Sequence, residues 1–317
     1  MTGKRILITG GAGAIGVNLT ELLLKEGIKE ICIVDNLTSG RREFLPEDNR
    51  IRFLQADIGD AAQIASIIKE CEPHYLFHLA AHFANQNSVD HPFDDLQTNV
   101  IGTMNLLEAL KARPGLEKFV YASSSCVYGN SAVMRETDAL YPHETPYAIN
   151  KFTAELYARY YAHLHQVPTV SVRIFNTYGP YEPAGKYRNV IPNFIAQAMR
   201  AEPLIITGTG EETRDFTYAS DTATLLLLAA KSDLRSGEAV NGGTGKATAI
   251  GYLARRIIEL TGSSSELRFV PRRNWDQISD RCADISRAAA HLGYSPKVDF
   301  ETGLKKTVEW HLKQSKD

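Results

Sequence analysis

The chain has 317 residues, of which 44% are hydrophobic and 23% charged, proportions typical of a soluble globular protein. Its formal net charge is −2 and it has no basic block, which argues against nucleic acid and membrane surfaces as partners. No apolar run reaches the ~18 residues of a membrane-spanning helix. The first residues lack the features of a signal peptide, and the four cysteines lack paired spacing. We therefore expect a cytoplasmic protein with reduced thiols, no disulfide framework and no metal site.

Short apolar runs and helical patterns alternate through the first half of the chain. Strands rich in Ile, Val and Leu are expected at 5–9, 30–35, 51–55, 75–79, 118–122 and 169–174. Helical patterns lie between them at 15–25, 61–69, 96–110 and 146–163. This alternation indicates βαβ units and a parallel sheet that is covered on both faces. The sequence predicts an α/β fold, with a doubly wound parallel sheet over residues 1–176.

The regular alternation ends near residue 176. Further helices are expected at 191–201, 221–230, 249–260 and 300–312, and short strands at 204–207, 239–241 and 267–270. No flexible linker separates the two halves. We predict a smaller α/β substrate domain over residues 177–317, interleaved with the first, so that some of its segments return to the large sheet.

A glycine-rich segment between the first strand and the first helix reads Thr9-Gly10-Gly11-Ala12-Gly13-Ala14-Ile15-Gly16. Its first glycine allows a tight turn, the third lets the backbone approach a pyrophosphate, and the last allows the helix to pack closely on the sheet. The helix N-terminus adds free N–H groups and a partial positive charge. These features predict a dinucleotide site.

Asp35 ends the second strand, where its carboxylate can accept hydrogen bonds from an adenosine ribose. A carboxylate in this place repels the 2′-phosphate of NADP, which favours NAD. Arg41 and Arg42 follow closely and weaken that preference.

Tyr147 and Lys151 stand four residues apart in a helical pattern, so that their side chains share one face. An ammonium beside a phenol lowers the pKa of the phenol from roughly 10 toward neutral pH. Such a phenol can take a proton from a sugar or alcohol hydroxyl and return it. The chain has 14 tyrosines, so this spacing alone is close to chance and depends on the other motifs.

Taken together, these segments resemble the extended short-chain dehydrogenase/reductase family, and within it the NAD-dependent nucleotide-sugar epimerase/dehydratase branch. The other motifs that carry the resemblance are Asp57-Ile58, His78-Leu79-Ala80-Ala81, Asn99, Ser123-Ser124-Ser125-Cys126-Val127-Tyr128-Gly129, Arg173-Ile174-Phe175-Asn176-Thr177-Tyr178-Gly179-Pro180, Asn189-Val190-Ile191-Pro192 and Thr213-Arg214-Asp215-Phe216. They cover nearly the whole chain. The resemblance implies a Rossmann-type fold, NAD as cofactor and a nucleotide-diphosphate sugar, expected to be a UDP-sugar, as substrate.

The resemblance also implies which residues contact each ligand. Those expected at the cofactor are Gly10, Gly13, Ala14, Ile15, Gly16, Asp35, Asn36, Asp57, Ile58, Leu79, Ala80, Ala81, Asn99, Tyr147 and Lys151. Those expected at the substrate are Ser125, Asn176, Asn189, Val190, Arg214, Arg273 and Asp276.

The arginines are expected at the diphosphate, because a guanidinium binds phosphate oxygens in pairs. Arg214 and Arg273 match the family's positions best, and Asp276 matches an acid on the nucleotide ribose. Arg173 and Arg188 are further candidates, although each can also be an ordinary surface arginine.

Ser124, Tyr147 and Lys151 would form the catalytic set of such an enzyme. The Ser124 hydroxyl would bond the substrate oxygen that Tyr147 deprotonates, and Lys151 would also hold the nicotinamide ribose. Hydride would leave the sugar carbon as Tyr147 takes the proton, giving NADH and a ketone.

The residues next to Ser124 discriminate among the activities of the branch. Its 4,6-dehydratases and decarboxylases usually have an acid directly before Val-Tyr-Gly or one place earlier, where this chain has Cys126 and Ser125. Cys126 could act as a thiolate base, but it has no cation beside it in sequence and is interpreted as a small packing residue. We therefore expect a UDP-sugar 4-epimerase that works through a transient 4-keto sugar and enzyme-bound NADH. The alternatives are a 4-ketoreductase, a 4,6-dehydratase or decarboxylase, and a cofactor-binding protein without turnover.

Some segments depart from the family's pattern. Residues 82–88 differ from the common sugar-facing sequence, and Tyr181 stands where many relatives have an arginine. Arg281 is expected near the sugar, where it could meet a sugar carboxylate or pair with Asp280. The helices at 96–110 and 146–163 have apolar faces that resemble the family's intersubunit four-helix bundle, so a homodimer is expected.

Overall fold

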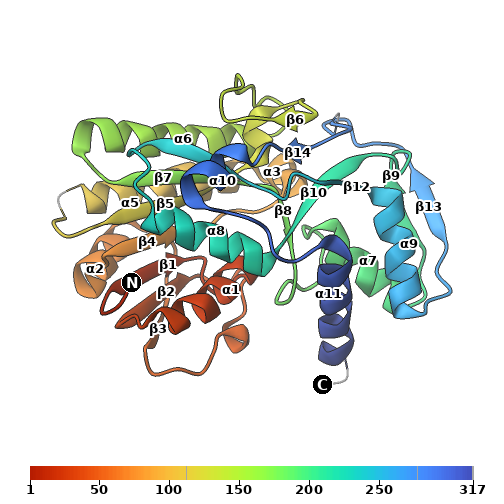
Figure 1. Cartoon of the computed structure of the whole chain (residues 1–317), viewed down its shortest axis with the longest axis horizontal. Helices are drawn as coiled ribbons and strands as arrows, with labels where there is room; N and C mark the ends of the chain where they lie inside the picture. The colour runs from red at the N-terminus through yellow and green to blue at the C-terminus, as the bar shows by residue number, and fades with distance from the viewer. Residues whose placement is uncertain (112, 277, 316–317) are drawn as a thin grey trace.

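The central sheet has seven strands in the order β11-β7-β5-β4-β1-β2-β3, all parallel (Figure 1). In chain order they are β1 (Arg5–Thr9), β2 (Glu30–Asp35), β3 (Ile51–Gln55), β4 (Tyr75–His78), β5 (Lys118–Ser124), β7 (Thr169–Ile174) and β11 (Glu238–Gly242). The structure is a computed structural model that describes residues 1–111, 113–276 and 278–315. The strand order reverses between β1 and β4, and ligands of doubly wound folds bind outside the carboxyl ends of the strands at that point.

Helices cover both faces of this sheet (Figure 1). α1 (Ala14–Leu23) and α8 (Ala219–Lys231) pack on the face to which Ile6 and Ile8 of β1 point. α2 (Ala61–Cys71), α5 (Thr103–Leu110) and α6 (Pro146–His165) pack on the opposite face, around Leu7. Successive side chains of a strand point to opposite faces, so each strand contributes to two cores. The doubly wound parallel sheet predicted from the sequence is confirmed.

A smaller α/β lobe begins directly after β7. Its helices α7 (Val190–Met199), α9 (Ile250–Thr261) and α11 (Phe300–Gln314) share a separate apolar core. Its strands are β8 (Asn176–Tyr178), β10 (Thr213–Tyr218) and β12 (Ala247–Ala249) in one sheet, and β9 (Leu204–Thr207) with β13 (Leu267–Val270) in another. A third pair joins β6 (Val133–Met134) to β14 (Cys282–Ala283). β11 and α8 return to the large sheet, while the boundary at residue 176 stays a prediction.

The helix expected at 96–110 differs in form from the prediction. It begins as α4 (Pro92–Leu96), passes through the π-helical segment η3 (Gln97–Gly102) and continues as α5. A π-helical turn inside a helix often marks a functional site, and this one carries Asn99. The sequence analysis also missed α3 (Asn85–Asp90), α10 (Ser286–Leu292) and strands β6, β8, β10, β12 and β14. Most of these are too short to show a clear period.

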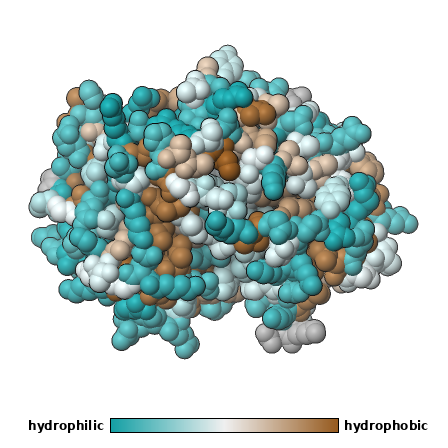
Figure 2. Space-filling model, in the orientation of Figure 1, coloured by the Kyte–Doolittle hydropathy of each residue, from teal (hydrophilic) through white to brown (hydrophobic). Residues whose placement is uncertain are grey.

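Hydrophilic residues dominate the face shown in Figure 2, and the hydrophobic residues visible there form narrow strips. None of the helices within the described residues has both the length and the hydrophobicity needed to cross a bilayer.

A buried ion pair ties α6 to the neighbouring strands. Arg173 of β7 is 5% exposed and donates from Nη2 to Glu155 Oε1 of α6 at 2.7 Å. Arg173 Nη1 also donates to the Tyr128 hydroxyl, and Ser123 of β5 donates to Glu155 at 2.6 Å. Burial opposes the charge of Arg173, but Glu155 and Tyr128 raise its pKa above the ordinary arginine value. The interpretation of Arg173 as a diphosphate ligand is therefore wrong, because its guanidinium lies inside the protein.

We predict that Glu155→Gln destabilises the fold by about 3–5 kcal/mol, because it leaves the Arg173 charge buried without a counter-charge. Urea unfolding followed by circular dichroism measures this loss. The control is Glu202→Gln, which breaks the exposed Arg200–Glu202 pair and should leave the stability nearly unchanged. Equal losses in the two variants would contradict the structural role of the buried pair.

Candidate active site

The glycine loop connects β1 to α1 and leaves an open cradle at the carboxyl end of the sheet. Gly10 has a φ of +68°, and a Cβ there would lie 2.5 Å from the backbone nitrogen of Ala80. A Cβ on Gly16 would lie 2.5 Å from the Cα of Gly11. At Gly13, by contrast, a Cβ would meet only the Gly10 carbonyl oxygen, at 3.3 Å. Close backbone contacts thus require glycine at positions 10 and 16, whereas Gly13 faces open space.

Helix α1 begins at Ala14 and Ile15 with no side-chain cap. Its first N–H groups therefore point into the cradle without an internal partner, as a pyrophosphate site requires.

Asp35 lies at the end of β2, beside this cradle. Its carboxylate accepts hydrogen bonds from the backbone N–H groups of Ala12, at 3.0 Å, and Leu37, at 2.9 Å. Burial raises the pKa of Asp35 and the two donors oppose that rise. Arg41 and Arg42 are engaged elsewhere: Arg41 lies 3.4 Å from Glu43, and Arg42 lies over the Phe53 ring.

The loops after β2 and β3 complete the adenosine side of the cradle. The Asn36 amide donates to Asp57 Oδ2 at 2.8 Å and joins the two loops. The side chain of Ile58 is buried, and a Cβ on Gly102 would lie 2.6 Å from it. A ligand could therefore meet Ile58 only through its backbone.

The loop after β4 carries Leu79, Ala80 and Ala81, and Asn99 holds it in place. The Asn99 amide accepts from the backbone N–H of His82 at 3.0 Å and donates to its carbonyl at 3.2 Å. Asn99 is thus a supporting residue, and Ala80 forms the wall opposite Gly10.

The three expected catalytic residues converge where β5 ends and α6 begins. Thr145 caps α6, and Ser88 accepts a hydrogen bond from the backbone N–H of Tyr147 at 3.0 Å. Lys151 donates from Nζ to the Ala122 carbonyl at 2.8 Å, and Nζ lies 6.0 Å from the centroid of the Tyr147 ring.

Burial determines the protonation states of this set. It raises the pKa of Tyr147, and the Cys126 and Asp95 charges add to the rise, while the Ser124 hydroxyl opposes it. Burial also lowers the pKa of Lys151 to about 8. The direction for Tyr147 is opposite to that predicted from the Tyr–Lys spacing, because loss of solvation outweighs the nearby ammonium. The phenol is therefore harder to ionise in the protein alone than in water.

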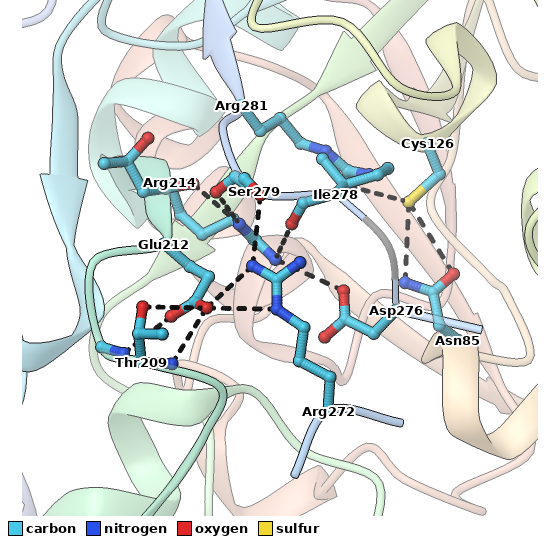
Figure 3. A network of polar contacts seen from close by, with 12 residues as sticks. Asn85, Cys126, Thr209, Glu212, Arg214, Arg272, Asp276, Ile278, Ser279 and Arg281 are labelled. Atoms are coloured by element: carbon cyan, nitrogen blue, oxygen red, sulfur yellow. Dashed lines mark hydrogen bonds and ion pairs between the residues drawn. The ribbon is translucent and has the colours of Figure 1, made fainter. Parts of the chain in front are cut away.

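Cys126 packs in one buried cluster with Tyr147, against an arginine from a distant part of the chain (Figure 3). Arg281 Nη1 donates to Cys126 Sγ at 3.2 Å, and the Asn85 amide lies 3.7–3.8 Å from that sulfur. Cys126 is 7% exposed and Arg281 8%.

These contacts overturn two sequence interpretations. Cys126 was interpreted as a packing residue because no cation lies beside it in sequence. In the structure, Arg281, which is 155 positions away in sequence, supplies that cation. Nor does Arg281 pair with Asp280, whose carboxylate accepts instead from the Thr213 hydroxyl at 2.7 Å.

Arginines also mark the opposite end of the site (Figure 3). Arg214 donates to the carbonyls of Thr213, Ile278 and Ser279, and its Nη2 lies 3.6 Å from Asp276. Arg272, which the sequence analysis missed, binds Glu212 at 2.7 Å. The structure does not bring Arg273 into this group: it is exposed and lies over the Trp275 ring.

The remaining predicted residues lie in the smaller lobe or directly after β5. The Asn189 amide donates to Glu182 at 2.9 Å, and Val190 begins α7 without a side-chain cap. Asn176 opens β8, and Ser125 is buried at the start of the 3₁₀ turn η4 (Ser125–Tyr128).

Two further residues have their side chains engaged elsewhere. Arg188 donates to the Ser39 carbonyl at 2.7 Å. Tyr181 donates to Glu21 at 2.7 Å and packs on Trp310, so it takes part in a structural cluster. No group of three or more His, Cys, Asp or Glu side chains in the described ranges is arranged to hold a metal ion.

Comparison with known proteins identifies the family. The pattern of the NAD-dependent epimerase/dehydratase family matches residues 6–243. The chain belongs to this family. NAD is therefore its cofactor, and the open glycine cradle, the uncapped helix α1 and Asp35 fit that molecule.

Relatives within the family differ in activity. The chain is 35% identical to the UDP-N-acetyl-alpha-D-glucosaminuronate decarboxylase of Bacillus cytotoxicus, over 97% of both chains. Among solved structures, an epimerase of Methanothermobacter thermautotrophicus is 42% identical, with a TM-score of 0.96 over 99% of this chain and 94% of that one. The UDP-glucose 4-epimerase of Thermotoga maritima, solved with UDP-glucose, is 33% identical, with a TM-score of 0.91 over 98% of this chain and 99% of that one. The protein is thus an NAD-dependent enzyme of a family of UDP-sugar epimerases and decarboxylases.

We predict that Asp35→Asn weakens NAD binding by about 10- to 100-fold, because a charged acceptor for the ribose hydroxyls is lost. NADP binding should weaken less or improve, since the repulsion of the 2′-phosphate is removed. Titration calorimetry on cofactor-free protein measures both constants. Glu43→Gln, an exposed change nearby, is the control, and an unchanged ratio of the two constants in Asp35→Asn would exclude Asp35 from the ribose site.

Proposed function

We propose that the protein is a UDP-sugar 4-epimerase that oxidises and re-reduces one sugar carbon while NAD stays bound. The observation that carries the proposal is the convergence of Ser124, Tyr147 and Lys151 beside the dinucleotide cradle, with no carboxylate at positions 125 and 126. A dehydratase needs an acid there to protonate a leaving hydroxyl. The similarity to a UDP-glucose 4-epimerase supports the same activity.

The environment of Tyr147 supports its role as the proton acceptor of the C4 hydroxyl. Burial keeps the phenol protonated in the protein alone, so its ionisation depends on what else binds. NAD, when bound, would supply a cationic ring and would accept the hydride. Ser124 hydrogen bonds to Tyr147 and can bind the same substrate oxygen. Lys151 is anchored by Ala122, which leaves its other N–H groups for the ribose hydroxyls.

The lobe side of the pocket is suited to the nucleotide diphosphate. Arg214 is partly buried, and both desolvation and the Arg281 charge lower its pKa. A diphosphate would relieve this repulsion, and the first N–H groups of α7, at Val190 and Ile191, add donors. We therefore assign Arg214, Val190 and Asn176 to the substrate, and we leave Asn189 as a support because its amide is bound to Glu182.

We further propose that α6 and the α4–η3 segment form a homodimer interface. Both elements present large apolar side chains to solvent, and they contact each other within the protomer. The exposed residues are Phe93, Leu96, Ile101, Ile149, Leu156, Tyr160 and Leu164. A second copy would cover them and complete a four-helix bundle.

We predict that the purified protein interconverts the C4 epimers of a UDP-sugar without added cofactor. The test is incubation with UDP-glucose, UDP-N-acetylglucosamine and their uronates, followed by NMR and mass spectrometry. A C4 epimer supports the proposal. A 4-keto-6-deoxy sugar, released CO₂, or a strict need for added NAD(P)H would contradict it.

Tyr147→Phe is the matched control for this experiment, because it removes only the phenolic hydroxyl. It should keep NAD bound and lower turnover by about 10²- to 10⁴-fold. Turnover equal to that of the wild type would remove Tyr147 from the mechanism.

We predict a solution mass near twice the 35.1 kDa of the chain, measured by light scattering. Leu156→Glu places a charge near the middle of the apolar surface of α6 and should give a monomer. Phe269→Glu is the control, since Phe269 is similarly exposed on β13, in the other lobe. A wild-type monomer would contradict the proposed interface.

A further inference from the structure

We propose that Cys126 is a second proton-transfer residue of this active site, which exchanges the proton on a carbon next to the transient C4 ketone. The inference rests on the proposed function, because it needs that ketone. It adds to C4 epimerisation a reaction at C3 or C5, in which a carbon-bound hydrogen is replaced from solvent.

The position of the thiol is the first argument. Cys126, Tyr147 and Ala148 pack together in one buried cluster, with Phe83 against it. Ser124 accepts a hydrogen bond from the backbone N–H of Cys126 at 3.2 Å, so the thiol lies close to the serine that is proposed to bind the substrate oxygen. A group in this place can reach a carbon adjacent to the one that Tyr147 and Ser124 serve.

The burial of Arg281 is the second argument, and it is independent of the cysteine's position. Its side chain is 8% exposed, and its Nε has no hydrogen-bond partner in the described residues. The acid beside it in sequence, Asp280, is bound to Thr213. A buried cation requires a counter-charge, and the group within 3.2 Å of Nη1 is the Cys126 sulfur.

The electrostatics of the pocket favour the thiolate. Burial alone would raise the pKa of Cys126, but the Arg281 charge and hydrogen bonds from Ser124, Arg281 and Asn85 lower it below its ordinary value. Among the described residues, the charge of Cys126 also affects the pKa of Tyr147, Lys151 and Arg214. Lysine and arginine carry positive charge, so they favour the thiolate as well.

The chemistry balances without any further reagent. A ketone at C4 acidifies the C–H bonds at C3 and C5. The thiolate takes that proton, and the electron pair of the C–H bond moves to the C4 oxygen as an enolate. The hydroxyls of Tyr147, protonated in the preceding oxidation, and Ser124 can hydrogen bond to that oxygen. The thiol exchanges its proton with solvent, and a solvent-derived proton then returns to the carbon.

Simple C4 epimerisation leaves no such label, because the hydrogen returned to C4 is the hydride first removed from it. Deuterium on carbon therefore separates the two reactions. Return to the same face gives exchange with retention, and return to the opposite face also inverts C3 or C5.

The experiment uses the enzyme with its bound NAD in D₂O, with the UDP-sugar and UDP-uronate set above. Proton NMR follows the H3, H4 and H5 signals, and mass spectrometry counts deuterium. We expect the wild type to incorporate deuterium at C3 or C5. In Cys126→Ser, whose hydroxyl does not ionise near neutral pH, the ratio of exchange to C4 turnover should fall by about 100-fold or more. Cys282→Ser, a cysteine outside the pocket whose pKa burial raises, is the matched control and should keep the wild-type ratio.

Arg281 acts through Cys126 as a positioning residue, and a pH profile tests it. In Arg281→Met the pH of half-maximal exchange should rise by about 1–3 units, because the stabilising charge is lost, and Arg281→Lys should restore part of the shift. Thermal melting checks that each variant is folded.

The outcomes separate this inference from the proposed function. C4 epimerisation without deuterium on carbon overturns the inference and leaves the function standing. Exchange in Cys126→Ser at the wild-type ratio also overturns it. The absence of any C4 oxidation overturns both.

Discussion

The spacing of the proposed catalytic groups depends on the buried ion pair between Glu155 and Arg173. It fixes α6, which carries Tyr147 and Lys151, against β5 and β7 at the level where Ser124 ends β5. The network continues from Arg173 through the Tyr128 hydroxyl to Asn241 of β11. The Asn241 amide in turn donates to the carbonyls of Met134 and Asp284, on either side of the β6–β14 pair. Arg281 directly precedes β14, so one buried network holds both the catalytic helix and the segment that brings an arginine to Cys126.

Loss of solvation governs the chemistry of this site more than any single pair of charges. It raises the pKa of the Tyr147 phenol and lowers the pKa of Lys151 to about 8, so the phenol is harder to ionise and the ammonium loses its proton more readily than in water. The pKa values of Tyr147 and Lys151 should therefore change when a charged ligand binds beside them. Cys126 is the exception, because the nearby Arg281 charge and the hydrogen bonds to the thiol lower its pKa more than burial raises it. In the proposed mechanism, Tyr147 thus depends on the bound cofactor to act as a proton acceptor, whereas Cys126 depends on Arg281 of the protein itself.

Local sequence patterns predicted much of this structure, but they could not predict contacts between residues that are far apart in the sequence. The strands of the large sheet and the glycine loop follow from hydrophobic runs and turn residues, which are local properties. The burial of Arg173 could not be read from its motif, because it depends on Glu155 on a neighbouring helix. The proximity of Cys126 to Arg281 joins positions 155 residues apart, and the rise in the pKa of Tyr147 comes from packing by several elements. The sequence motifs predicted where the candidate site lies, whereas the pKa values of its residues depend on the three-dimensional packing.

A cysteine at position 126 differs from the acid of dehydratases in a way that suits an epimerase. A carboxylic acid can protonate a hydroxyl leaving from the carbon next to an enolate, which drives dehydration. A thiol is in general a weaker proton donor to such an oxygen than a carboxylic acid, and its anion is a stronger base toward a C–H bond than a carboxylate. Ser125 in the adjacent place supplies no acid either. The Cys126–Arg281 pair thus allows a carbon next to the ketone to exchange its proton while the neighbouring hydroxyl stays in place, which separates enolisation from elimination within one pocket.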